Sequence, residues 1–162
     1  MTHRRIKIAG GCMALAILLL DQASKYCVLY ALNLPTIHQI VVLPFFNLTM
    51  VWNRGITFGL LTSDADTAQL IFSALALLAV IAFAVWLWRT HSWWVALAVG
   101  AIAGGAIGNV IDRLRFGAVV DFLHVHAWGW SWYVFNIADA AIVCGVAALI
   151  AENLFVKTEE PQ

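Results

Sequence analysis

The apolar residues of this chain fall into four long runs separated by shorter, more polar segments. The runs cover about residues 8–29, 68–88, 93–111 and 134–156. A helix needs about 20 mainly apolar residues to cross the roughly 30 Å hydrocarbon layer of a bilayer, and each run has this length. The pattern therefore predicts an all-α polytopic membrane protein with four transmembrane helices.

The two longest segments between the runs have a different character. Residues from about 33 to 66 contain two β-rich stretches bounded by Pro and Asn, which predict a small strand pair or sheet lying on the membrane. Residues from about 117 to 133 are expected to form a loop anchored at the membrane interface by aromatic side chains, namely Trp128, Trp130, Trp132 and Tyr133. No linker or repeat divides residues 1–162, so we expect a single membrane-embedded domain.

Composition supports a lipid environment for most of the chain. Hydrophobic residues make up 63% and charged residues only 11%, whereas soluble domains carry about 25% charged residues. The formal net charge is zero, which excludes a basic surface for nucleic acid. Gly100, Gly104 and Gly108 form two overlapping GxxxG motifs, which we expect to pack helices within one chain, so a monomer is favoured.

Basic residues in the short flanks predict the orientation in the membrane. They occur at three places that a four-span topology puts on one side: Arg4, Arg5 and Lys7, then Arg89, then Lys157. Both termini are therefore expected in the cytoplasm. Arg54, Arg113 and Arg115 lie on the opposite side and weaken this bias, but they belong to polar motifs. The first run could also be a cleavable signal peptide; it continues to Leu32 without a cleavage pattern, so a retained helix is expected.

Ionisable side chains inside membrane spans are costly and are usually functional. Four carboxylates lie in or beside the predicted spans: Asp21, Asp112, Asp121 and Asp139. The helical rise places all of them near the outer ends of the helices. Asp21 has Lys25 four residues later on the same helical face, and Asp112 is followed by Arg113 and Arg115. Because buried charges are usually paired, we expect structural roles for Asp21 and Asp112.

Asp121 and Asp139 have no cation within a helical turn. Burial disfavours the charged carboxylate, and two such groups side by side share one proton. One can then activate water while the other protonates the scissile carbonyl, which is the chemistry of an aspartic protease. Asn136, one turn before Asp139, could orient the pair, as could Asn109 and Arg113 on a common helical face. A helix-to-helix hydrogen bond is the alternative role for the asparagines.

Other functions account for these residues less well. His124 and His126 could belong to a metal site, but a third strong ligand is not evident, so neither a metal nor a cofactor is expected. A small proton-coupled carrier also needs intramembrane carboxylates, but it requires polar groups through the whole membrane depth, and the inner helix halves are nearly all apolar. A purely structural subunit would not explain why Asp121 and Asp139 occupy apolar surroundings, where a carboxylate is energetically unfavourable.

Five polar motifs occur in a set order along the chain. They are Asp21-Gln22-x-Ser24-Lys25, Asn53-Arg54-Gly55-x-x-Phe58-Gly59, Gly104-Gly105-x-x-Gly108-Asn109-x-x-Asp112-Arg113, Val119-Val120-Asp121-Phe122 and Phe135-Asn136-x-Ala138-Asp139. In this order and spacing the motifs resemble those of bacterial lipoprotein signal peptidase, also called signal peptidase II. One motif alone would be a weak signal, whereas five in order over nearly the whole chain are highly specific.

The resemblance implies an aspartic endopeptidase of the bacterial inner (cytoplasmic) membrane, with an extracytoplasmic β-cradle beside its four helices. The implied substrates are diacylglyceryl-modified prolipoproteins, cut just before the lipid-bearing cysteine, and membrane lipids surround the enzyme. The implied active site lies near the periplasmic face and uses no cofactor.

The resemblance also implies roles for individual residues. Asp121 and Asp139 match the catalytic pair. The polar set around the site is matched by Asn53, Gly55, Asn109, Arg113 and Asn136. Positions that hold the cradle and helices are matched by Asp21, Lys25 and Asp112, and Gly105 matches a glycine at a tight helix contact. Two departures, Arg54-Gly55-Ile56-Thr57 after the first Asn and Ala140 after the second Asp, concern the fit of the substrate rather than the catalytic pair.

Overall fold

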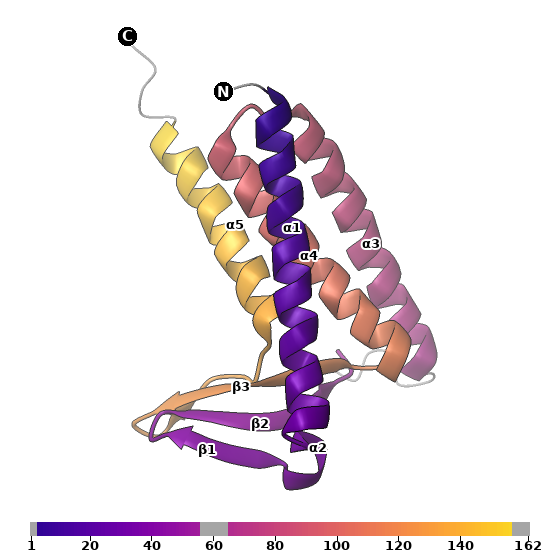
Figure 1. Cartoon of the computed structure of the whole chain (residues 1–162), viewed down its shortest axis with the longest axis vertical. Coiled ribbons are helices and arrows are strands. Elements are labelled where there is room, and N and C mark those ends of the chain that lie inside the picture. The colour runs from indigo at the N-terminus through magenta and orange to yellow at the C-terminus, as the bar shows by residue number, and fades with distance from the viewer. Residues whose placement is uncertain (1–2, 56–64, 157–162) are drawn as a thin grey trace.

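The computed structural model describes residues 3–55 and 65–156. Within them, four long helices stand together on one side of a small β-sheet (Figure 1). The helices are α1 (His3–Tyr26), which continues as the π-helical turn η1 (Cys27–Ala31), and then α3 (Ala65–Arg89), α4 (Trp93–Phe116) and α5 (Ile137–Val156). Each is long and apolar enough to cross a membrane, which confirms the predicted fold class.

Helices α1 and α4 extend beyond the apolar runs that predicted them. Helix α4 continues to Phe116 and ends where Gly117 takes a φ of +66° and donates its N–H to the carbonyl of Arg113. The last turns of α4 contain Asn109 and Asp112, which are buried against other polar groups. A run of apolar residues ends at such polar positions, so hydropathy predicts a shorter helix. The helix itself continues through them because other polar groups of the fold form hydrogen bonds with their side chains.

Helix α4 lies at the centre of the bundle, between α3 and α5 and against α1 (Figure 1). A Cβ atom on Gly100 or Gly104 would collide with carbonyl oxygens of Gly10 or Ala14 on α1. On another face, a Cβ on Gly105 would lie 2.6 Å from the Ala138 oxygen on α5. The predicted use of these glycines for packing within the chain is therefore confirmed.

The sheet caps the end of the bundle where α4 ends and α5 begins (Figure 1). It is antiparallel, in the order β1 (Gln39–Leu43), β2 (Phe46–Asn53), β3 (Val119–Ala127) and β4 (Trp130–Ser131), and the short helix α2 (Leu34–Ile37) precedes β1. Residues 56–64 of the predicted β-rich segment lie outside the described residues, as do Phe58 and Gly59 of the second motif and Lys157.

The prediction of a loop at residues 117–133 was wrong. Most of this segment forms β3 and β4, and β3 pairs with β2 along most of its length, for example Asp121 opposite Val51. Since β2 lies about 70 residues earlier in the chain, a local pattern cannot show that its backbone is available for pairing. Val120 and Phe122 of β3 pack with Val28, Leu29 and Leu34 in a buried cluster beneath α1, which fixes the sheet to the bundle.

Candidate active site

Asp121 is positioned by pairing of β3 on two sides. Besides its pairing with β2, β3 receives Phe135, whose N–H donates to the Leu123 oxygen at 3.0 Å and whose oxygen accepts from the Leu123 N–H at 2.8 Å. Phe135 directly precedes Asn136 at the start of α5. This pairing places the Asp121 carboxylate beside the first turn of α5, where only 1% of Asp121 is exposed.

Asp139 is positioned by the N-terminal cap of α5. The Asn136 Oδ1 atom accepts the N–H of Asp139 at 2.9 Å, and Asp139 Oδ2 accepts the N–H of Asn136 at 3.3 Å. These reciprocal bonds form a capping box, in which each side chain satisfies a backbone donor at the helix start. The cap leaves Asp139 Oδ1 free for another partner, and it holds the carboxylate in one orientation.

Two amide side chains, those of Asn136 and Asn109, connect the carboxylates of Asp121 and Asp139. Asn136 Nδ2 donates to Asp121 Oδ1 at 2.7 Å and to Asn109 Oδ1 at 3.2 Å. Asn109 Nδ2 in turn donates to Asp139 Oδ1 at 2.8 Å. The sequence left open whether these asparagines serve only helix packing; in the structure the Asn136 amide donates to the Asp121 carboxylate and the Asn109 amide donates to the Asp139 carboxylate.

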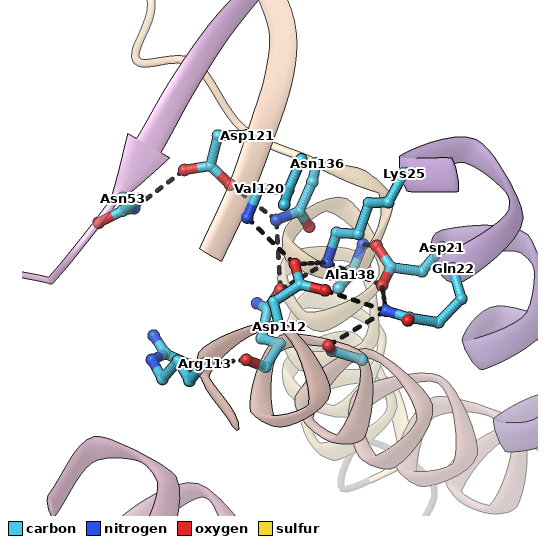
Figure 2. A network of polar contacts seen from close by, with 12 residues as sticks. Asp21, Gln22, Lys25, Asn53, Asp112, Arg113, Val120, Asp121, Asn136 and Ala138 are labelled. Atoms are coloured by element: carbon cyan, nitrogen blue, oxygen red, sulfur yellow. Dashed lines mark hydrogen bonds and ion pairs between the residues drawn. The ribbon is translucent and has the colours of Figure 1, made fainter. Parts of the chain in front are cut away.

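Asn53 holds the other oxygen of Asp121. Its Nδ2 atom donates to Asp121 Oδ2 at 2.9 Å (Figure 2), while its Oδ1 atom accepts the N–H of Gly55 at 2.8 Å. Gly55 has a φ of +71°, and a Cβ atom there would lie 2.9 Å from the ring of Phe72. A side chain at this position would be strained and crowded, so glycine is required for the turn that fixes Asn53.

Lys25 joins Asp21 and Asp112 in one buried cluster (Figure 2). Its Nζ atom lies 2.8 Å from Asp21 Oδ2 and 2.7 Å from Asp112 Oδ2, and it donates to Asn109 Oδ1 at 3.1 Å. The expected pair of Asp21 with Lys25 is present. For Asp112, however, the cation is Lys25 on α1 rather than Arg113 or Arg115, because the packing of α1 on α4 brings a buried ammonium closer than either neighbour in sequence.

Asp21 and Asp112 each also bind the backbone N–H of the residue directly before one member of the candidate pair. Asp21 Oδ1 accepts the N–H of Ala138 at 3.0 Å, and Asp112 Oδ2 accepts the N–H of Val120 at 3.1 Å. Ala138 and Val120 are the residues preceding Asp139 and Asp121 in the chain. The cluster therefore fixes the backbone on which both carboxylates stand.

Arg113 lies beside the site without an ion pair to any described carboxylate. Its Nη1 atom donates to the Asn109 oxygen at 3.4 Å, and its guanidinium carbon lies 5.9 Å from the centre of the Phe72 ring. The Arg113 side chain is thus half-buried near both Asp121 and Asp139.

The surroundings of Asp121 favour its protonated form. Burial raises the pKa of Asp121 from its ordinary value of 3.8 to about 6, and the negative charge of Asp139 adds to this rise. The hydrogen bonds from Asn53 and Asn136 and the charge of Lys25 act in the opposite direction. A carboxyl group that titrates near neutral pH can exchange protons with a substrate.

A groove of about 900 Å³ opens beside Asp121. It is lined by Val51, Trp52, Asn53, Arg54, Gly55, Asp121, His124, Ser131, Trp132, Tyr133 and Val134. The wall is a mixture of backbone, aromatic rings and a few polar groups, with Asp121 facing the space.

The two histidines considered as metal ligands are held by other polar side chains. His124 contacts Ser131 Oγ at 2.7 Å and Thr49 Oγ1 at 3.3 Å, and His126 contacts Asn47 at 2.9 Å. The ring centres lie 5.3 Å apart. Across residues 3–55 and 65–156, no group of three or more His, Cys, Asp or Glu side chains is placed to hold a metal ion.

Two glutamines contribute to the site although the sequence did not single them out for a role. Gln22 Nε2 donates to Asp112 Oδ1 at 3.2 Å and to the Gly108 oxygen at 3.3 Å, which joins α1 to α4. Gln69 Nε2 donates to the Arg54 oxygen at 2.6 Å. Both glutamines are polar residues within an apolar span, which is the signal that identified the carboxylates and would also have identified Gln22 and Gln69.

Comparison with known proteins identifies the family. The model of the family described as signal peptidase (SPase) II matches residues 13–155. The chain belongs to the signal peptidase II family. It is 45% identical over 148 residues to a lipoprotein signal peptidase of Methylobacterium sp. (strain 4-46), covering 91% of this chain and 90% of that protein. It is 44% identical to a lipoprotein signal peptidase of Rhodopseudomonas palustris (strain ATCC BAA-98 / CGA009), covering 95% and 94%.

Solved structures agree with this family membership. A bacterial membrane enzyme solved by the in meso method at 1.9 Å resolution superimposes with a TM-score of 0.78 at 27% identity, over 90% of this chain and 92% of that chain. Signal peptidase II enzymes are proteases, so the chain is a protease embedded in a membrane, and an inner membrane fits the family. The alternative of a proton-coupled carrier is not supported.

Proposed function

We propose that the chain removes signal peptides from diacylglyceryl-modified prolipoproteins by cutting just before the lipid-bearing cysteine. The observation that carries this proposal is the pair of carboxylates, Asp121 and Asp139, which are linked by the Asn136 and Asn109 amides and of which Asp121 lines the groove. The names of the family and of the relatives support lipoprotein precursors as the substrate.

In the proposed mechanism, Asp121 and Asp139 share one proton and bind the attacking water between them. The ionised carboxylate removes a proton from the water as its oxygen attacks the scissile carbonyl carbon, and the protonated carboxyl group donates to the carbonyl oxygen. The resulting tetrahedral diol returns a proton through the pair to the leaving amine nitrogen, and the C–N bond breaks. Asn53, Asn136 and Asn109 hold the carboxylates in place, and the proposal requires no metal and no covalent intermediate.

Substrate contacts are proposed for the groove and for Arg113, which lies outside the groove lining but near both carboxylates. The backbone at Gly55 is available to polar groups of the substrate, and the aromatic lining accepts its apolar residues. Gly105 and the cluster of Asp21, Lys25 and Asp112 act structurally, because they set the approach of α4 to α5 and the backbone of the carboxylate pair. We propose that bundle and sheet work as one peptidase domain and that the protein is a monomer.

The proposed location is the bacterial inner membrane, with both termini in the cytoplasm and the active site near the periplasmic face. The start of α1 and the end of α5 lie at the end of the bundle away from the sheet, and Arg4, Arg5 and Arg89 are found at that end (Figure 1). The exposed ring of Trp128 and those of Trp130 and Tyr133 suit the opposite, outer interface.

The topology can be checked with reporter fusions in cells. A fluorescent protein that matures only in the cytoplasm should be bright when fused to the C-terminus. A periplasm-dependent phosphatase inserted at Gly129, in the turn between β3 and β4, should be active. The reverse pattern would contradict the proposed orientation.

The proposed activity is tested by cleavage with purified protein in lipid. A prolipoprotein that carries the diacylglyceryl group should be cut just before its modified cysteine, which mass spectrometry of both products would locate. The same precursor without the lipid should be cut at a rate lower by about 100-fold or more, since binding energy from remote substrate parts supports catalysis. EDTA should leave the rate unchanged. Cleavage elsewhere, equal cleavage of both precursors or loss of activity with EDTA would contradict the proposal.

A further inference from the structure

Gln69 is a buried amide in the apolar helix α3. Only 5% of Gln69 is exposed, and burying an amide costs free energy unless it is hydrogen-bonded. Its Nε2 atom donates to the Arg54 carbonyl oxygen at 2.6 Å, the shortest side-chain hydrogen bond found in residues 3–55 and 65–156. This bond connects α3 with the residue that follows β2.

Arg54, whose carbonyl accepts this bond, directly follows Asn53, the residue that donates a hydrogen bond to Asp121. Strand β2 ends at Asn53, whose last sheet partner is Val119, and Arg54 stands between Asn53 and Gly55. Asn53 donates to Asp121 at 2.9 Å and accepts from the Gly55 N–H at 2.8 Å. The peptide group at Arg54 lies beyond the sheet, so the fixed position of the Asn53 side chain depends on what holds Arg54.

We propose that Gln69 is a positioning residue for the catalytic pair: by binding the Arg54 carbonyl, it holds Asn53 in hydrogen-bonding distance of Asp121. The inference rests on the proposed roles of Asp121 and Asp139. Gln69 itself does not line the groove beside Asp121, and its effect passes through Asn53. Helix α3, which packs mainly on α4, thereby becomes a support of the active site.

Ser73 provides a matched control one turn further along α3. Only 4% of Ser73 is exposed, and it lines the same pocket of about 280 Å³ as Gln69 and Arg113. Among the described residues, however, its Oγ atom has no hydrogen-bond partner. If removing any buried polar group from α3 disturbed the fold, then replacing either Gln69 or Ser73 would lower activity. If Gln69 acts on Asn53, only its replacement should do so.

The test compares Gln69→Met with Ser73→Ala in the prolipoprotein assay. Gln69→Met should lower kcat/KM by about tenfold, the effect of one lost hydrogen bond on a positioned group, while Ser73→Ala stays within about twofold of wild type. Loss of the Asn53 bond destabilises ionised Asp121, so the acidic limb of the pH–rate profile should move to higher pH. The charges that face Asp121, namely Asp139 on α5, Lys25 on α1 and Arg113 on α4, are unchanged in this variant.

A double-mutant cycle with Asn53→Ala separates positioning from general damage. If Gln69 acts through Asn53, then the double variant Asn53→Ala/Gln69→Met should be no slower than Asn53→Ala alone. Additive losses, or an unmoved acidic limb in Gln69→Met, would overturn the proposal. Gln69→Leu serves as a second variant, and failure of both to fold would also overturn it, since the amide would then be needed for folding. Wild-type activity in Asp121→Asn would instead overturn the catalytic pair itself.

Discussion

Asparagine in place of Asp139 should lower kcat by at least about 10³-fold, and Asp121→Asn should do the same. General acid–base catalysis contributes about 10²–10⁴-fold, and the proposed pair performs both the acid and the base step. An amide has nearly the same shape as a carboxyl group, so the hydrogen bonds from Asn109 and Asn136 can be partly replaced and the fold should persist. The measurement is single-turnover cleavage of the lipid-modified prolipoprotein.

Glu152→Gln is the matched control for this prediction. It makes the same chemical change on the same helix, α5, but at the opposite end, where Glu152 accepts a hydrogen bond from Ser92 at 2.7 Å. Its rate should remain near that of wild type. Full activity in either Asp121→Asn or Asp139→Asn, or an equal loss in Glu152→Gln, would refute the assignment of the pair. The two asparagine variants need not be equally impaired.

The second large effect is expected for Lys25→Met, which should lower the free energy of unfolding by about 3–5 kcal/mol. Lys25 is 2% exposed and is the cation shared by Asp21 and Asp112, which are 0% and 1% exposed. Removing the ammonium leaves two buried carboxylates facing each other without compensation. Their bonds to the backbone at Ala138 and Val120 should loosen as well, so activity should fall together with stability.

The stability loss can be measured as a shift in the midpoint of unfolding by sodium dodecyl sulfate, followed by circular dichroism. Arg115→Met is the control, since it removes one positive charge at the exposed end of α4 and should change stability by less than about 1 kcal/mol. Similar midpoints for Lys25→Met and Arg115→Met would show that the buried cluster does not support the fold. A restored midpoint in Lys25→Met/Asp112→Asn would show that the uncompensated charge causes the loss.

Membership of the signal peptidase II family changes the meaning of the remaining polar residues. In this membrane-embedded protease, two groups of buried polar residues near the carboxylate pair differ in what they contact. Asn53, Asn109 and Asn136 touch the carboxylates, whereas Asp21, Lys25 and Asp112 fix the backbone that carries them. This division explains why four carboxylates gather at one end of the bundle although the proposed chemistry uses two.

The sequence by itself determined the membrane class and the four helices, because a span must satisfy its backbone internally and carry apolar side chains along its whole length. It also separated Asp121 and Asp139 from the other carboxylates. The pairing of Asp21 with Lys25 was visible too, since residues four apart share a helical face.

Only the tertiary structure decided which distant groups meet. The partner of Asp112 is Lys25 on another helix. The segment 117–133, which was predicted to be a loop, is mostly strand. Gln69, near the start of α3, donates a hydrogen bond to the carbonyl oxygen of Arg54. Hydropathy and helical spacing describe a residue's own element. Hydrogen bonds and ion pairs between elements depend instead on how closely the helices approach, which the glycines of α4 set through backbone contact.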